Sequence, residues 1–167
     1  MGPLRAALFD WGGTLAASHR RLEFLHGDAG AQLAVLHRDT IPVLLALRKR
    51  GILAVVVTNT SHAPELFLAA LARSPIRGLI AFVVQSSEPD MCAKPCGAIF
   101  RKALDSMNLR PQDVVFVGNS FEADVVGASR LGIPAGWVRD GDLALALAQA
   151  LRQREQMGLS NNNSLRD

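Results

Sequence analysis

The chain has 167 residues, of which 49% are hydrophobic and 20% charged, a composition typical of one folded domain. Its net charge of +3 comes from scattered basic residues, so we expect neither nucleic-acid nor membrane partners. No apolar run reaches the ~18 residues of a membrane span, and the N-terminus lacks the pattern of a signal peptide. We therefore expect a cytoplasmic protein whose two cysteines, Cys92 and Cys96, are reduced.

Five short apolar runs predict strands. They are RAALF (5–9), ILAVVV (52–57), LIAFVV (79–84), VVFV (114–117) and PAGWV (134–138). Apolar spacing between and after them predicts helices at 39–51, 63–74, 95–108, 122–132 and 142–158. Continuous Val, Ile and Leu runs suit strands that are buried on both faces. The alternation predicts an α/β fold: a three-layer αβα sandwich with a doubly wound parallel sheet of about five strands.

We expect one domain over residues 1–157, with a short insert at about 16–38 and a polar, disordered tail at 158–167. The insert is too short to form a separate cap domain. The gap between the second strand and Lys94 holds only one helix and one strand, so it has no room for a cap either. The sequence therefore predicts a site that is open to bulk water.

Polar residues follow four of the predicted strands. Asp10 follows the first strand, Thr58 and Asn59 the second, Lys94 the third, and GNSFEAD (118–124) the fourth. In an open parallel sheet, ligands bind beyond the carboxyl ends of the strands. A single polar residue in such a place is more often a helix cap, but four sets in this order indicate a functional site.

Four stretches carry a resemblance to a known family. DWGGT, VVVTN, AKPCGAIF and VGNSFEAD resemble, in order and spacing, the four motifs of the haloacid dehalogenase superfamily, most of whose members are phosphohydrolases. In that family the first motif is D-x-D-G-T and the fourth is G-D-S-x-x-x-D. The chain departs from both, because Gly12 replaces the second Asp of the first motif and Asn119 replaces the Asp of the fourth. The resemblance implies a Rossmann-like fold without a cap.

The resemblance also implies roles for individual residues. Asp10 would be the nucleophile and form an aspartyl-phosphate. Thr58 would donate a hydrogen bond to the phosphoryl oxygens, and Lys94 would neutralise their charge. The substrate-binding residues would be Trp11, Gly12, Asn59 and Ser120. Mg²⁺ would be held by Asp10, the carbonyl oxygen of Gly12, Asn119 and Asp124, because hard oxygen ligands suit this ion.

The departure at Gly12 leaves three readings open. The usual second Asp protonates the leaving group, and such general acid catalysis is worth ~10²–10⁴ in rate. The first reading is a weak phosphatase of a small or bulky phosphorylated substrate. The second is a catalytically degenerate protein that binds a phosphoryl ligand or a protein partner.

The third reading is a hydrolase of C–P or C–halogen bonds. The DWGGT motif is similar to that of phosphonoacetaldehyde hydrolases, which use a lysine of a cap domain. The absence of lysine between Thr14 and Arg48 argues against this reading. The sequence leaves the identity of the substrate and the oligomeric state open.

Overall fold

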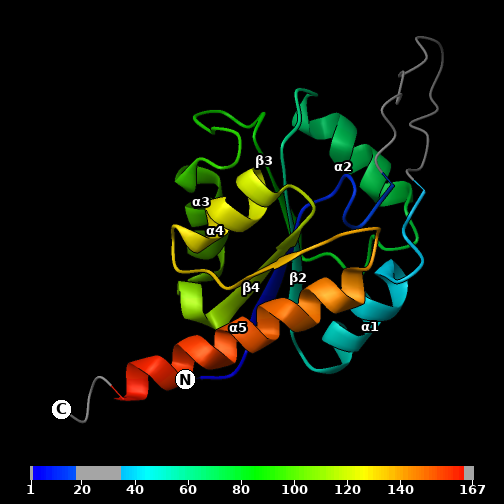
Figure 1. Ribbon diagram of the computed structural model, residues 1–167. Coiled ribbons are helices and arrows are strands. Elements are labelled where there is room, and N and C mark those ends of the chain that lie inside the picture. The colour runs from blue at the N-terminus through cyan, green and yellow to red at the C-terminus, as the bar shows by residue number, and fades with distance from the viewer. Residues whose placement is uncertain (1, 18–34, 164–167) are drawn as a thin grey trace, which may run out of the picture.

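A parallel five-stranded sheet forms the centre of the computed structural model, which describes residues 2–17 and 35–163 (Figure 1). Its strands are β1 (Ala6–Phe9), β2 (Leu53–Thr58), β3 (Phe82–Gln85), β4 (Val114–Gly118) and β5 (Ala135–Trp137). They lie in the order β3-β2-β1-β4-β5, and every neighbouring pair is parallel. The structure confirms the predicted α/β fold with a doubly wound sheet.

Helices cover both faces of the sheet. They are α1 (Thr40–Lys49), α2 (Pro64–Arg73), α3 (Gly97–Met107), α4 (Gly127–Ser129) and α5 (Leu143–Asn163), with a short 3₁₀ turn η1 (Pro111–Asp113) and a π-helical turn η2 (Phe121–Val126). Ala7 and Phe9 of β1 pack into the core shared with α1 and α5. Ala6 and Leu8 point the other way, into the core shared with α3 and α4. Both faces of β1 are therefore buried, which explains its continuous apolar sequence.

Three predicted elements differ from the structure by more than two residues or in continuity. β3 begins at Phe82 rather than 79, because Leu79 lies in a turn in which its N–H donates to the Ile76 carbonyl at 2.8 Å. The predicted helix at 122–132 is split between η2 and α4. The predicted end of the last helix at Gly158 is wrong, because α5 continues to Asn163.

The continuation of α5 has a simple backbone reason. A glycine ends a helix by taking a positive φ, and Gly51 and Gly132 do so after α1 and α4. Gly158 is not among the residues with positive φ. Residues 158–163 of the predicted disordered tail are therefore helical, and 164–167 lie outside the described residues.

Most of the predicted insert, residues 18–34, also lies outside the described residues. The chain on either side of it is paired, because the N–H of Ala17 donates to the carbonyl of Val35 at 2.8 Å. The residues on the two sides of the insert therefore lie next to each other. Within the part of the chain that the structure describes, no helix has the length and apolarity to cross a membrane.

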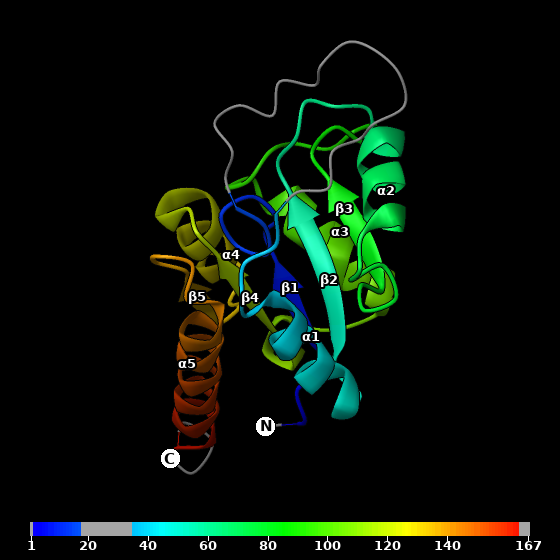
Figure 2. The ribbon, with the colours of Figure 1, turned by 90° about the vertical axis from the view of Figure 1, so that its right-hand side faces the viewer.

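The direction of the connections reverses at β1. The chain moves from β1 outward through β2 to β3, and then returns to the other side of β1 with β4 and β5. Such a switch point opens a crevice beyond the carboxyl ends of the two strands. Phe9 at the end of β1 lies opposite Val56 of β2 and Val117 of β4. The residues that follow these strands therefore gather at one end of the sheet, the upper end in Figure 2.

Candidate active site

Lys94 lies at the centre of a buried group of charges at this end of the sheet. Its Nζ is 2.7 Å from Asp10 Oδ1 and 2.8 Å from Asp124 Oδ1, and it donates a hydrogen bond to the Val57 carbonyl at 2.8 Å. The Lys94 side chain is 1% exposed. Among residues 2–17 and 35–163, only the ammonium pairs with these two buried carboxylates, so the three side chains form one electrostatic unit.

Burial governs the ionisation of Asp10. The loss of solvation raises the pKa of its carboxyl above the ordinary value of 3.8. The positive charge of Lys94 opposes this shift in the pKa, whereas the negative charge of Asp124 adds to it. A carboxylate that is poorly solvated and held by a single cation is the state that a nucleophile needs.

The turn after β4 places Asp124. Its Oδ2 accepts the backbone N–H of Ser120 at 2.9 Å, while its Oδ1 faces Lys94 as an ion pair without the alignment of a hydrogen bond. The Ser120 hydroxyl accepts the N–H of Ala123 at 3.2 Å and so caps η2. Gly118 allows this approach, since a side chain there would overlap the Asp124 carboxyl group. Both oxygens of Asp124 are therefore occupied in holding Lys94 and the turn.

Asn119 meets the first motif on the other side of Asp10. One polar atom of its amide lies 3.2 Å from Asp10 Oδ2 and 2.9 Å from the Gly12 carbonyl oxygen. With nitrogen in that place, the amide donates to both oxygens. With oxygen there, three oxygens face one another, an arrangement that needs a cation among them. Two neighbouring ligands of an octahedral Mg²⁺ at about 2.0–2.1 Å lie roughly 2.9 Å apart.

The donor set of Asp10 Oδ2, Gly12 O and Asn119 Oδ1 therefore fits Mg²⁺ in chemistry and spacing. It holds one carboxylate, one carbonyl and one amide oxygen. No cluster of three or more His, Cys, Asp or Glu side chains suited to a metal occurs in the described ranges. A metal bound here would therefore need neutral oxygens beside its carboxylate ligands.

The loop after β1 is a tight turn that contains Gly12 and Gly13. The Trp11 carbonyl accepts the N–H groups of Leu15 and Ala16, each at 3.0 Å. Gly13 has a φ of 79°, which favours glycine. Gly12 differs, because its φ is not positive and a Cβ added there would meet no atom within 4 Å. The backbone conformation at residue 12 therefore does not require glycine, so the absence of a carboxylate there has no backbone cause.

Trp11 itself points toward α2 rather than over the charges. Its ring contacts that of Phe67 edge to face, with centroids 5.1 Å apart. Thr58 is buried at the end of β2, two positions after the residue paired with Phe9, so it lies at the same end of the sheet. The structure thus brings Asp10, Thr58 and Lys94 to one edge, as the sequence predicts.

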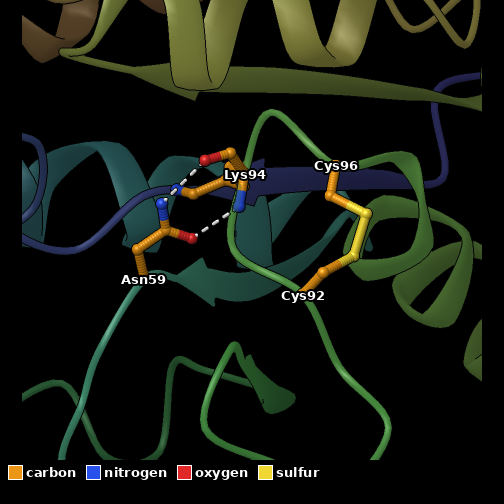
Figure 3. The surroundings of a disulfide bond; sticks show 4 residues. All are labelled: Asn59, Cys92, Lys94 and Cys96. Atoms are coloured by element: carbon orange, nitrogen blue, oxygen red, sulfur yellow. Dashed lines mark hydrogen bonds between the residues drawn. A yellow bond between two sulfur atoms is a disulfide. The ribbon is translucent and has the colours of Figure 1, made fainter.

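The side chain of Asn59 has a place that the sequence did not indicate. Its Oδ1 accepts the backbone N–H of Lys94 at 2.7 Å, and its Nδ2 donates to the Lys94 carbonyl at 3.0 Å (Figure 3). Two further residues were missed. Thr14 is fully buried, with Oγ1 3.5 Å from Asp10 Oδ2, and the Trp137 indole donates to the Asn119 carbonyl at 3.0 Å.

The prediction of reduced cysteines is wrong. Cys92 and Cys96 form a disulfide across the Lys94 loop, with their Cα atoms 5.9 Å apart (Figure 3). The prediction relied on the expected compartment, whereas the geometry of the loop decides whether two nearby sulfurs meet.

Comparison with known families agrees with this geometry. The model of the haloacid dehalogenase-like hydrolases matches residues 25–132. The chain belongs to this family. The match includes the second, third and fourth motifs of the chain. It begins after Asp10, so the first motif is assigned from the contacts described above and not from the family model.

Several curated relatives of this chain are phosphatases by name. A glyceraldehyde 3-phosphate phosphatase of Pyrococcus furiosus is 27% identical over 101 residues, covering 60% of this chain and 41% of that protein. A phosphoserine phosphatase of Thermus thermophilus is 29% identical over 106 residues, covering 64% and 41%. The chain thus spans about two fifths of the length of these relatives.

Solved structures share the fold. An uncharacterised protein from Listeria monocytogenes serotype 4b is 26% identical, with a TM-score of 0.68, and covers 81% of this chain and 79% of its own. A haloacid dehalogenase-family phosphatase from Thermococcus onnurineus is 29% identical, with a TM-score of 0.57, covering 65% and 49%. These likenesses agree with the α/β fold of this chain.

Proposed function

We propose that this protein is a Mg²⁺-dependent phosphohydrolase that works through an aspartyl-phosphate on Asp10. The observation that carries the proposal is the buried unit of Asp10, Lys94 and Asp124 at the switch point of the sheet. Perturbed, buried ionisable groups in a crevice are characteristic of catalytic sites. The names of the curated relatives support phosphate monoesters as the class of substrate.

The first step is attack by an Asp10 carboxylate oxygen on phosphorus, which breaks the ester P–O bond and forms an acyl phosphate. Lys94 holds Asp10 in place and neutralises charge on the phosphoryl oxygens. The Thr58 hydroxyl donates to one of those oxygens. Water then cleaves the acyl phosphate, which releases inorganic phosphate and restores the Asp10 carboxylate.

Asp10, the Gly12 carbonyl and Asn119 would hold Mg²⁺, and Asp124 would act through Lys94 or a water molecule. When bound, this ion supplies charge neutralisation and orientation of the phosphoryl group. Asn119 contributes no charge, so the site should bind the ion less tightly than one with a second carboxylate. Trp11, Gly12, Asn59 and Ser120 stay predicted as substrate-binding residues.

The leaving oxygen has no proton donor at residue 12. Substrates whose leaving group departs without protonation, such as aryl phosphates, should therefore react fastest. This preference defines the test. Hydrolysis of an aryl phosphate is measured with and without Mg²⁺ for the wild type and for Asp10→Asn, which keeps the shape of the side chain and removes the nucleophile.

We expect Mg²⁺-dependent turnover, and a loss on the order of 10³-fold or more in Asp10→Asn, the scale at which removal of a nucleophile acts. Equal rates in the two proteins would refute the nucleophile assignment. The absence of turnover across aryl and alkyl phosphates would favour the second candidate, a degenerate protein that binds phosphoryl groups, which the loss of two family carboxylates supports. The cytoplasmic location stays a prediction.

A further inference from the structure

The catalytic lysine lies at the exact middle of a covalent ring. Cys92 precedes Lys94 by two residues, Cys96 follows it by two, and the disulfide joins them (Figure 3). The ring belongs to the loop between β3 and α3, and Lys94 is the residue of that loop whose side chain enters the buried charge group. Any change in the ring therefore acts on the backbone that carries the ammonium.

Lys94 is held from the opposite side by Asn59. That amide satisfies both the N–H and the carbonyl of Lys94, at 2.7 and 3.0 Å. The Nζ in turn is fixed by Asp10, Asp124 and the Val57 carbonyl. The disulfide is thus the one covalent member of a set of contacts that all converge on a single residue.

The position of the disulfide argues against a purely stabilising role. A cross-link stabilises a protein mainly by restricting the unfolded chain, and the effect grows with the length of the closed loop. Here the two cysteines are only 4 positions apart in sequence, so the restriction of the unfolded chain is small. Its restriction of the native loop, in contrast, falls on Lys94.

The two cysteines are also not fully buried. Cys92 and Cys96 are half-buried, and neither belongs to the two hydrophobic cores described for residues 2–17 and 35–163. Reduction would therefore leave both cores intact. Disulfides that are accessible and close short loops are the ones suited to reversible exchange.

We propose that Cys92 and Cys96 form a reversible redox site that positions Lys94, so that a dithiol lowers catalysis by opening the ring. This inference rests on the proposed phosphohydrolase function. One thiolate of the reductant attacks a sulfur of the pair and forms a mixed disulfide, which its second thiolate resolves. Two electrons and two protons pass to Cys92 and Cys96, and the reductant becomes a cyclic disulfide.

Reduction leaves Lys94 with the Asn59 contacts and its ion pairs, but with a freer backbone on the side of the ring. The ammonium must meet the phosphoryl oxygens within a few tenths of an ångström, and small misplacements of catalytic groups cost up to ~10² in rate. We expect kcat to fall about tenfold and KM to rise by a smaller factor, because Lys94 contacts the phosphoryl oxygens in the bound substrate as well as in the transition state.

The test compares hydrolysis of an aryl phosphate by the oxidised protein and by protein reduced with dithiothreitol, with free thiols counted by a colorimetric reagent. Reoxidation should restore kcat. The control is Cys92→Ala/Cys96→Ala, which removes both cysteines of the chain. It should have the kcat of the reduced protein and no response to dithiothreitol. A purely structural cross-link would change the melting temperature while leaving kcat at 25 °C unaltered.

A second readout does not depend on turnover. The affinity for inorganic phosphate is measured by calorimetry in both redox states, because Lys94 faces the same oxygens in the free ion, and we expect weaker binding after reduction. Two counted thiols with unchanged kcat and unchanged phosphate affinity would overturn the redox proposal. Absence of turnover in both states, with a phosphate affinity that still depends on reduction, would refute the proposed hydrolase and leave the redox site in place.

Discussion

The two sides of Asp10 are built on different principles. On the side of Oδ1, a buried ammonium pairs with two carboxylates, and the Lys94 side chain is 1% exposed. On the side of Oδ2, the neighbours are the neutral groups Gly12 and Asn119. The Oδ1 side is charged and held by ion pairs, whereas the Oδ2 side is uncharged and has free space beside Gly12.

The difference indicates which part of the chemistry the chain retains. In the proposed function, the charged side would supply the nucleophile and its counter-ion, the parts needed to form an aspartyl-phosphate. The neutral side is where the family carries its acid and its second metal carboxylate, and both are absent. The site should therefore capture a phosphoryl group better than it expels a basic leaving group. Each side can be altered separately.

The largest effect is expected on the charged side, from Lys94→Met. The change leaves Asp10 and Asp124 facing each other without a cation, and breaking a buried pair typically costs about 3–5 kcal/mol in the free energy of unfolding. The rate on an aryl phosphate should fall by ~10²–10³, the scale of lost electrostatic stabilisation. Urea denaturation and steady-state kinetics measure the two effects.

The matched control for this change is Lys102→Met on α3. Lys102 is exposed, so its loss should alter the free energy of unfolding by no more than about 0.5 kcal/mol. Similar urea midpoints for the two variants would contradict the account of a buried charge unit.

On the neutral side, Gly12→Asp should restore a proton donor. The backbone accepts a side chain here, because the φ of Gly12 is not positive and a Cβ added there meets no atom within 4 Å. An alkyl phosphate, whose leaving group is basic, should gain up to ~10²-fold in kcat, while an aryl phosphate gains little. Equal changes on both substrates would mean that residue 12 does not face the leaving oxygen.

The adjacent glycine gives the control for folding. Gly13 has a φ of 79°, so Gly13→Ala should lower the free energy of unfolding by about 1–2 kcal/mol. Gly12→Ala should be nearly neutral. If both alanine variants were equally destabilised, the loop would require glycine at residue 12 as well.

A smaller effect is expected from Asn119→Asp, which adds a charged oxygen beside Asp10. Mg²⁺ affinity, measured by calorimetry on protein freed of metal, should rise about tenfold, the change that 1.4 kcal/mol of added attraction gives. Asn119→Leu removes the oxygen and should weaken binding. Unchanged affinity in both variants would place the metal elsewhere.

The smallest effect is a difference in the pH dependence of stability. In metal-free protein the folded pKa of Asp10 is raised above 3.8 by burial. For such a group the native state binds the proton more tightly than the unfolded state. Its contribution to stability is therefore complete below pH 3.8 and is lost as pH rises through the raised pKa.

Asp10→Asn cannot titrate, so the wild type should lose stability relative to this variant as pH rises across that window. Urea denaturation in the presence of a chelator, repeated at a series of pH values, measures the difference. A constant difference between the two proteins would mean that the pKa of Asp10 is not raised.

Local sequence determined the secondary structure and the fold class. Runs such as ILAVVV predicted strands buried on both faces, and the helices between them follow from apolar spacing and from terminal glycines such as Gly51. The motif positions of Asp10, Thr58 and Lys94 followed from the same order of elements. The end of α5 was predicted wrongly at Gly158, because the local sequence does not show whether a glycine takes a positive φ and ends the helix.

Only the tertiary structure decided how the site is held together. Lys94 and Asp10 are 84 positions apart, and Asn59 lies 35 positions from the Lys94 backbone that it binds. The pairing of Cys92 with Cys96 and the contact of Trp137 with Asn119 likewise depend on where folded segments meet. The reason is physical: local pattern fixes which face of an element is buried, whereas partners of buried polar groups are set by the packing of distant elements.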